Sequence, residues 1–205
     1  MEMQEIRTFG RRHGKKLSAR QDWLIQNILP TIAPHSGDIL EIGFGAGEHL
    51  RQLATRYPDK IIIGAEPFMN GVASLLSAMC DDDNTIRPEY KNIRILADDV
   101  RILLKNPNLK FEQIWILHPD PWPKARHEKR RLLSTEFLNI LSQHITPDGQ
   151  IIIGTDHHEY FDWICTNAAH TSMHAQIPNI ATIKTRYQTK NMAGTDAPKY
   201  IILSH

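Results

Sequence analysis

DILEIGFGAGEHL, residues 38–50, joins a short apolar run to three alternating glycines, Gly43, Gly45 and Gly47. The run at 38–43 is typical of a buried strand, and residues 48–57 have the apolar spacing of a helix. Because glycine lets the backbone turn sharply and approach a ligand closely, the glycines predict a tight turn between the two. This stretch therefore predicts a strand–turn–helix unit of an α/β domain.

Strands and helices alternate along the rest of the chain. Apolar runs predict further strands at 60–66, 92–97, 111–118, 149–156, 181–188 and 199–204, and helical spacing predicts helices at 70–79, 99–105, 131–145 and 158–169. The alternation indicates an α/β fold with a mostly parallel seven-stranded sheet and helices on both faces. We expect a basic N-terminal arm over residues 1–20 and a single domain over residues 21–205.

Acidic residues stand near three successive strand ends, where parallel sheets bind their ligands. Glu41 lies at the end of the first strand, and Glu66 follows the second at a distance suited to accepting hydrogen bonds from ribose hydroxyls. The alternative for Glu66 is a surface glutamate in a loop. Asp98 and Asp99 follow the third strand, where one carboxylate could bind an adenine amino group and Asp98 could cap the next helix.

The glycine spacing separates two kinds of cofactor. The dinucleotide fingerprint GxGxxG requires glycine at position 48, where this chain has Glu48. A glutamate at a helix start also faces a pyrophosphate with like charge. Both points favour a cofactor without phosphates, such as S-adenosyl-L-methionine, whose sulfonium and ammonium groups suit nearby carboxylates. A dinucleotide-dependent oxidoreductase is the disfavoured alternative.

HPDPWPKARHEKRR, residues 118–131, follows the fourth predicted strand. Its prolines fix the shape of the loop. Asp120 could accept a hydrogen bond from a nucleobase N–H, and Trp122 could either stack on a base or cover the sheet edge. Because the basic residues that follow could hold phosphates, the stretch has the composition of a nucleotide clamp.

The overall composition excludes several classes of protein. The formal net charge is only +1, so nucleic-acid binding has to be argued from the two basic clusters, at 7–20 and 124–131. No apolar run is long enough to cross a membrane, and the first residues lack a secretory signal. The two cysteines and eleven histidines show no metal-ligand spacing. We expect a cytoplasmic protein without a metal, either a monomer or a homodimer.

Several stretches resemble the bacterial tRNA (guanine-N7)-methyltransferases. They are FGRRHGKKLSARQ, LEIGFGAGEHL, GAEPFMNGV, DDVRILL, HPDPWPKARHEKRRL, the GTD at 154–156 and TRYQTK at 185–190. The resemblance implies a Rossmann-like class I methyltransferase. It also implies methyl transfer from S-adenosyl-L-methionine to N7 of a variable-loop guanine, at tRNA position 46, giving 7-methylguanosine.

The resemblance also implies roles for individual residues. Those matching the cofactor site are Glu41, Gly43, Gly45, Gly47, Glu66, Asp99 and Asp120, and Asp120 also matches the acid at the catalytic centre. Those matching the tRNA substrate site are Lys124, Asp156, Thr185, Arg186, Tyr187 and Gln188. The chain departs from the family at Gln188, where glutamate is usual, and at Pro123, where histidine is usual.

The chemistry of guanine N7 limits what a catalytic residue has to do. N7 carries a lone pair and no proton, so the attack on a methyl group needs no general base. A carboxylate near the guanine would instead orient the ring and stabilise its developing positive charge, which is the role predicted for Asp120. A non-catalytic RNA-binding module that retains the fold is the alternative function.

Overall fold

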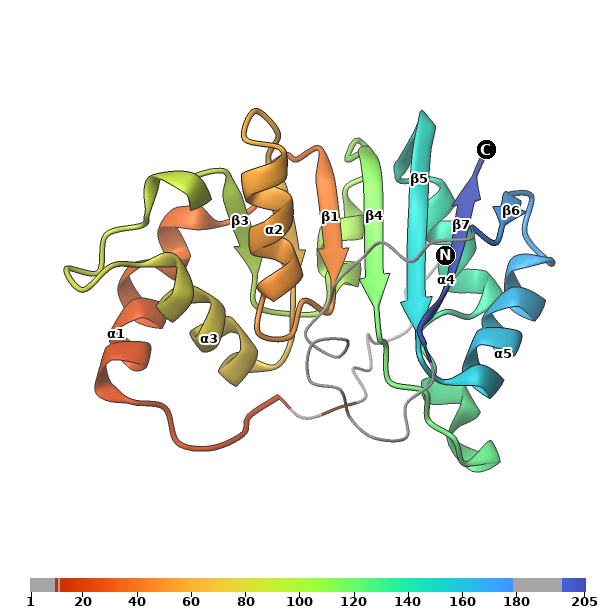
Figure 1. The fold of residues 1–205 in the computed structure, drawn as a ribbon, viewed down its shortest axis with the longest axis horizontal. Coiled ribbons are helices and arrows are strands. Elements are labelled where there is room, and N and C mark those ends of the chain that lie inside the picture. Colours follow the sequence, from red (N-terminus) through yellow and green to blue (C-terminus); the bar gives the residue numbers. More distant parts are fainter. Residues whose placement is uncertain (1–9, 11, 179–196) are drawn as a thin grey trace. The chain divides into compact units, whose positions relative to one another are not determined.

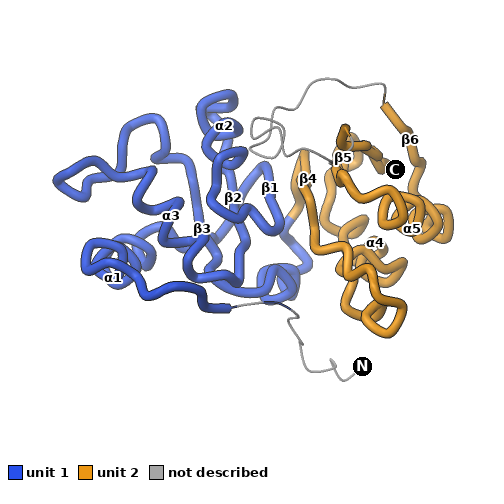
Figure 2. The backbone as a smooth tube through the Cα atoms, turned by 60° about the horizontal axis from the view of Figure 1, so that its bottom comes forward, with its two compact units in different colours: residues 1–109 blue, residues 110–205 orange. Residues whose placement is uncertain are grey.

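The computed structural model describes residues 10, 12–178 and 197–205. The backbone forms two compact units, residues 1–109 and residues 110–205, which are coloured separately in Figure 2. The predicted division into an arm over residues 1–20 and a domain over residues 21–205 stays a prediction.

Unit 1 contains three parallel strands in the order β3-β2-β1. These are β1 (Ile39–Ile42), β2 (Ile62–Ala65) and β3 (Ile93–Leu96), and every residue of β1 and β2 is buried. The arrowheads of β1 and β3 point the same way in Figure 1. Because the strands are parallel, the turns that follow them emerge at one edge of this part of the sheet.

The described residues of unit 1 also form three α-helices and three short 3-10 helices, some between the strands and others before β1 or after β3. The α-helices are α1 (Ala19–Asn27), α2 (Glu48–Arg56) and α3 (Met69–Met79), and the 3-10 helices are η1 (Leu29–Ile32), η2 (Pro88–Tyr90) and η3 (Val100–Lys105). A capping box formed by Ser18 and Gln21 starts α1, a helix that the sequence patterns did not predict.

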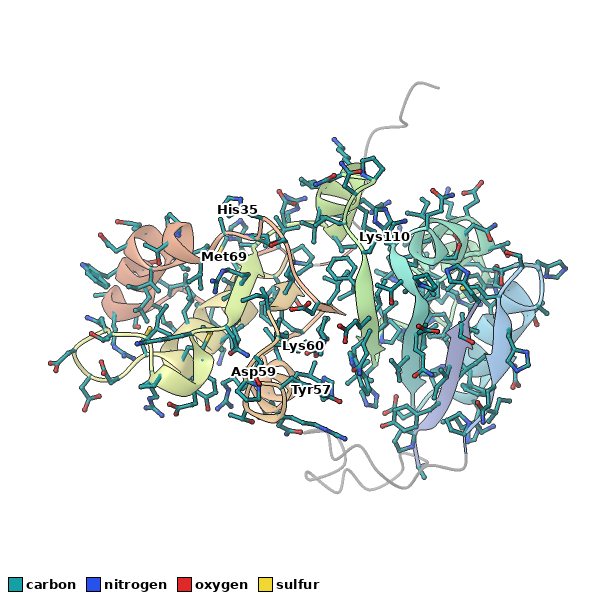
Figure 3. All side chains as sticks on the ribbon, turned by 90° about the horizontal axis from the view of Figure 1, so that it is seen from above. His35, Tyr57, Asp59, Lys60, Met69 and Lys110 are labelled. Atoms are coloured by element: carbon teal, nitrogen blue, oxygen red, sulfur yellow. The ribbon has the colours of Figure 1, made fainter. Side chains whose placement is uncertain are left out.

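The turn before β2, at residues 57–60, is stabilised by several hydrogen bonds. Between α2 and β2, the Lys60 N–H donates to the Tyr57 carbonyl at 3.1 Å, and both residues are labelled in Figure 3. The Asn92 side-chain amide donates to the carbonyls of Ala54, Tyr57 and Lys60. These bonds fix the start of β2, so the opposite, carboxyl ends can carry a site on a rigid base.

The described residues of unit 2 form four strands in the order β4-β5-β7-β6. Strands β4 (Phe111–Leu117) and β5 (Ile145–Thr155) are parallel, and β7 (Lys199–Ser204) runs antiparallel to β5 and to β6 (His174–Gln176). In Figure 1 the arrowhead of β7 points opposite to those of β4 and β5. The helices of the unit are η4 (Ala125–Arg130), α4 (Thr135–Ser142) and α5 (His158–Ala168).

Most predicted elements are confirmed, but besides the unpredicted α1 several others differ. The predicted helix at 131–145 is wrong at both ends, because Ser134 caps α4 and β5 already begins at Ile145. The helix predicted at 99–105 is the 3-10 helix η3, and β6 was not predicted. The strand predicted at 181–188 lies outside the described residues.

Candidate functional site

The turn after β1 has the backbone that only glycine adopts readily. Gly43, Gly45 and Gly47 have φ angles of +74°, +57° and +75°. A Cβ atom on Gly47 would lie 2.5 Å from the Leu75 Cδ1 atom, so close packing also requires glycine there. A Cβ atom on Gly43 or Gly45 would meet nothing within 4 Å. The turn therefore presents open backbone on which a ligand could lie.

Glu66 ties this turn to the loop after β2. Its Oε2 atom accepts the Gly45 N–H at 2.8 Å, and its Oε1 atom accepts the Phe68 N–H at 2.8 Å. The residue is only 8% exposed, so the alternative of a surface glutamate is wrong. These two hydrogen bonds hold the carboxylate beside the glycine turn.

Glu41 is a buried acid inside β1, with 3% of its surface exposed. Its Oε2 atom lies 3.2 Å from Nδ1 of His49, in the first turn of α2, but the contact lacks the angles of a hydrogen bond. Within the described part of the chain, no hydrogen bond reaches this oxygen. Since buried carboxylates are costly unless they are paired, the site suits a cationic donor from a ligand.

Asp98 and Asp99 have different roles from those that the sequence suggested. Asp99, not Asp98, caps η3, accepting the Arg101 N–H at 2.9 Å. Its two oxygens also accept Nε and Nη2 of Arg101 at 2.8 and 2.7 Å, and this hydrogen bonding raises the pKa of Arg101. Asp98 is more exposed and pairs with Arg12 at 3.2 Å. A cofactor contact at Asp99 stays a prediction.

In unit 2 the loop after β4 has an unusual backbone. His118 and Trp122 have φ angles of +50° and +42°, a region that non-glycine residues rarely enter. The His118 N–H donates to the Gly154 carbonyl at 2.7 Å, which fixes the start of the loop against β5. Asp120 lies between these two residues and is exposed, so its carboxylate can meet a substrate from solvent.

Asp156 follows β5 and lies next to the start of that loop. The His118 Nδ1 atom is 3.4 Å from Asp156 Oδ1, so the ends of β4 and β5 are joined by a pair of side chains. The next residue, His157, caps α5 by accepting the Tyr160 N–H, which confirms the predicted helix start. The structure therefore brings the loops of Asp120 and Asp156 together within unit 2.

Trp122 lies among the basic residues that follow it. The Arg130 guanidinium is 5.0 Å from the centre of the indole ring, and the His127 ring meets Trp122 edge-on at 5.6 Å. Desolvation lowers the pKa of His127, and the nearby cations of Arg130, Arg126 and Lys124 lower it further. An arginine therefore covers one face of Trp122 in this structure.

The remaining predicted site residues fall into two groups. Lys124 is exposed and stands immediately before η4. Thr185, Arg186, Tyr187 and Gln188 lie outside the described residues. Residues that contact predicted site residues but were not themselves predicted include His49, Arg101 and His118. Nothing in their spacing marks them, because each contact depends on the course of the backbone around it.

Metal sites and membrane spans are both absent from the described residues, 10, 12–178 and 197–205. These residues contain no group of three or more His, Cys, Asp or Glu side chains that could hold a metal ion. None of their helices combines the length and the apolar character that crossing a bilayer requires.

Solved structures share this fold at low sequence identity. An rRNA methylase from Streptococcus thermophilus matches with a TM-score of 0.54 and 12% identity, over 92% of this chain and 98% of that one. A precorrin-6y C5,15-methyltransferase from Geobacter metallireducens matches with a TM-score of 0.56 and 12% identity, over 94% and 92%. The predicted Rossmann-like class I methyltransferase fold, with its mostly parallel seven-stranded sheet, is confirmed.

Sequence relatives narrow the class to a family. A family model described as "Putative methyltransferase" matches residues 36–196. A tRNA (guanine-N(7)-)-methyltransferase of Neorickettsia sennetsu is 35% identical over 195 residues, covering 91% of this chain and 86% of the relative. One of Paramagnetospirillum magneticum is 34% identical over 226 residues, covering 96% and 91%. The chain belongs to the bacterial tRNA (guanine-N7)-methyltransferase family and is an enzyme of this type, so the non-catalytic alternative is not retained.

Proposed function

We propose that the enzyme transfers the methyl group of S-adenosyl-L-methionine to N7 of a guanine in tRNA, at position 46 of the variable loop, in the cytoplasm. The observation that carries the proposal is the pairing of an open glycine turn with buried carboxylates in unit 1. Family membership supplies the substrate, because the relatives are named for tRNA and for guanine N7.

The residues of unit 1 fit S-adenosyl-L-methionine on three counts. The Glu41 oxygen, which accepts no hydrogen bond from the described residues, suits the ammonium group of the cofactor. Glu66 is buried beside the glycine turn at the end of β2, the position at which an acid accepts hydrogen bonds from ribose hydroxyls. Glu48 begins α2 and so disfavours a phosphate at that helix start. When bound, the cofactor supplies an electrophilic methyl group on a sulfonium.

Asp120 acts on the guanine by orientation and charge. N7 attacks the methyl carbon with its lone pair, and the guanine ring gains a positive charge as the carbon–sulfur bond breaks. A carboxylate that accepts from the guanine N1–H or amino group stabilises that charge without removing a proton. Correct alignment of the two reactants can contribute about 7–11 kcal/mol.

The cations after Asp120 bind the tRNA backbone. Lys124, Arg126 and Lys129 are all exposed and adjoin the loop of Asp120. Contacts of this kind give affinity that depends on salt but carry no sequence information. Asp156, together with residues 185–188, completes the substrate side by family likeness. Selection of the guanine therefore depends on the carboxylates and on the fold of the tRNA.

The test is incubation with methyl-labelled S-adenosyl-L-methionine and unmodified tRNA, followed by nucleoside analysis. We expect label in 7-methylguanosine, and no label in a matched tRNA transcript with adenine at position 46. Label in another nucleoside, or equal label in the adenine transcript, would contradict the proposed site. Calorimetry with S-adenosylhomocysteine and with NAD separates the cofactor assignment from the tRNA assignment, since only the first is expected to bind.

A further inference from the structure

The last arginine of the basic run makes different contacts from the other cations. Arg131 stands directly after η4 in extended backbone, and its Nε–H donates to the Pro121 carbonyl at 2.9 Å. Pro121 is the residue after Asp120. A single side chain thus joins the end of the segment to the loop that carries the predicted catalytic carboxylate.

The Arg131 guanidinium also lies over two aromatic rings of α5. Its central carbon is 5.5 Å from the ring centre of Tyr160 and 5.1 Å from that of Trp163. These two residues are three positions apart, so they share one face of the helix, and their rings are 5.6 Å apart. Cation–π contacts within about 6 Å of a ring centre are attractive, and more so where water is excluded.

The α5 face that contacts Arg131 is partly buried, and it makes a second contact with residues 121–131. Tyr160 is fully buried, and burial raises its pKa to about 12, although the Arg131 cation acts in the opposite direction. The Trp163 Nε1–H donates to Glu128 Oε1 at 2.8 Å. Two side chains of α5 therefore hold residues 121–131, and α5 begins directly after the loop of Asp156.

We infer that Arg131 is a positioning residue that fixes the Asp120 loop against α5, not a phosphate contact of the tRNA. The inference rests on the proposed function, because it assumes that Asp120 acts on the guanine. Its chemistry requires arginine specifically. Only a planar guanidinium can lie over two rings while its Nε–H reaches a carbonyl, and lysine keeps the charge without either feature.

The experiment compares arginine-to-lysine substitutions at two sites. In Arg131→Lys we expect single-turnover methyl transfer, at saturating tRNA and cofactor, to fall about 10- to 100-fold, as for a small misplacement of a catalytic group. The tRNA dissociation constant and its salt slope should stay close to those of the parent. Arg56→Lys is the matched control, because Arg56 is exposed and also lies over an aromatic ring, Tyr57, but far along α2 from the glycine turn.

A second readout does not depend on activity. Hydrogen exchange at the amides of residues 122–131 should become faster in Arg131→Lys and stay unchanged in Arg56→Lys. If Arg131→Lys does not fold, Trp163→Phe tests the same idea, because it keeps an aromatic ring at this position but removes the hydrogen bond to Glu128 and weakens the contact with Arg131. We expect it to give the same changes at smaller size.

Three results would overturn the inference. A normal rate at saturation with weaker tRNA binding and a lower salt slope would make Arg131 a phosphate contact. Normal rate, binding and exchange would leave it without a role. Slow transfer with unchanged exchange would place its action elsewhere than in the loop. If the parent enzyme itself labels no tRNA guanine, the proposed function fails, while the exchange data still decide whether Arg131 fixes the loop.

Discussion

Replacing Glu66 with alanine tests two roles of one carboxylate, stabilising the fold and binding the cofactor. The side chain accepts backbone N–H groups from Gly45 and Phe68, both at 2.8 Å, and it is nearly buried. A hydrogen bond to a charged group contributes about 1.5–3 kcal/mol. Loss of both bonds should therefore lower the free energy of unfolding by about 3 kcal/mol or more in the absence of any ligand.

The second loss concerns the cofactor. If Glu66 also accepts hydrogen bonds from the ribose hydroxyls, Glu66→Ala should weaken binding by a further ~1.5–3 kcal/mol, or about 10- to 150-fold. Urea denaturation of the free protein measures the first loss, and calorimetry with S-adenosylhomocysteine measures the second. Glu89→Ala is the matched control, since Glu89 is an exposed glutamate in η2 of the same unit.

The two measurements can refute the two parts independently. Unchanged cofactor affinity in a folded Glu66→Ala protein would remove Glu66 from the ligand site and leave it a loop-fixing residue. Unchanged stability would show that the two backbone hydrogen bonds contribute little. Glu66→Gln sharpens the distinction, because its amide can still accept one N–H but turns an NH₂ group toward the other.

Other residues give predictions of the same kind. Asp120→Asn should lower single-turnover methyl transfer about 100-fold or more without weakening tRNA binding, and raising the pH should not restore it, so near-normal turnover would refute the electrostatic role. Gly47→Ala should cost more unfolding free energy in urea than Gly43→Ala, because only the first Cβ atom meets Leu75, whereas Gly43→Ala should mainly weaken binding of S-adenosylhomocysteine. Replacing the exposed Lys15 and Lys16 with alanine should lower the salt slope of tRNA binding by about 0.7–0.9 for each phosphate that the arm no longer neutralises, and an unchanged slope would remove them from the interface.

Local patterns were sufficient to predict the glycine turn, the strand before it and the helix after it. The positive φ angles of Gly43, Gly45 and Gly47 follow from the need to reverse the chain within a few residues, so their spacing could be interpreted without tertiary information. The same holds for the helix predicted at 158–169, which the structure has as α5. Such features are determined by residues that are adjacent in the sequence, so the sequence alone is enough to predict them.

Features that depend on the exact course of the backbone could not be predicted. Asp98 and Asp99 are adjacent acids, and only the direction of the chain at η3 decides that Asp99 is the cap and holds Arg101. Leu132 and Leu133 extend the apolar spacing of α4, but the backbone at Arg131 is extended and Ser134 starts the helix. Because the Ser134 side chain accepts the Phe137 N–H, α4 begins there and not at residue 131.

The number of lysines and arginines in residues 124–131 overestimates how many of them can contact tRNA phosphates. The segment has five lysines and arginines, yet Arg130 lies over Trp122 and Arg131 lies between Pro121 and two rings of α5. Three cations remain exposed, and exposed cations are the ones that can replace the counterions of a phosphate backbone. The segment should therefore contribute a salt slope of about 2–3, where all five charges would give about 3.5–4.5. The basic residues of this stretch differ in exposure and therefore in role. The exposed cations bind the backbone of the tRNA, and the inner arginine keeps the loop of Asp120 in the shape that the chemistry needs.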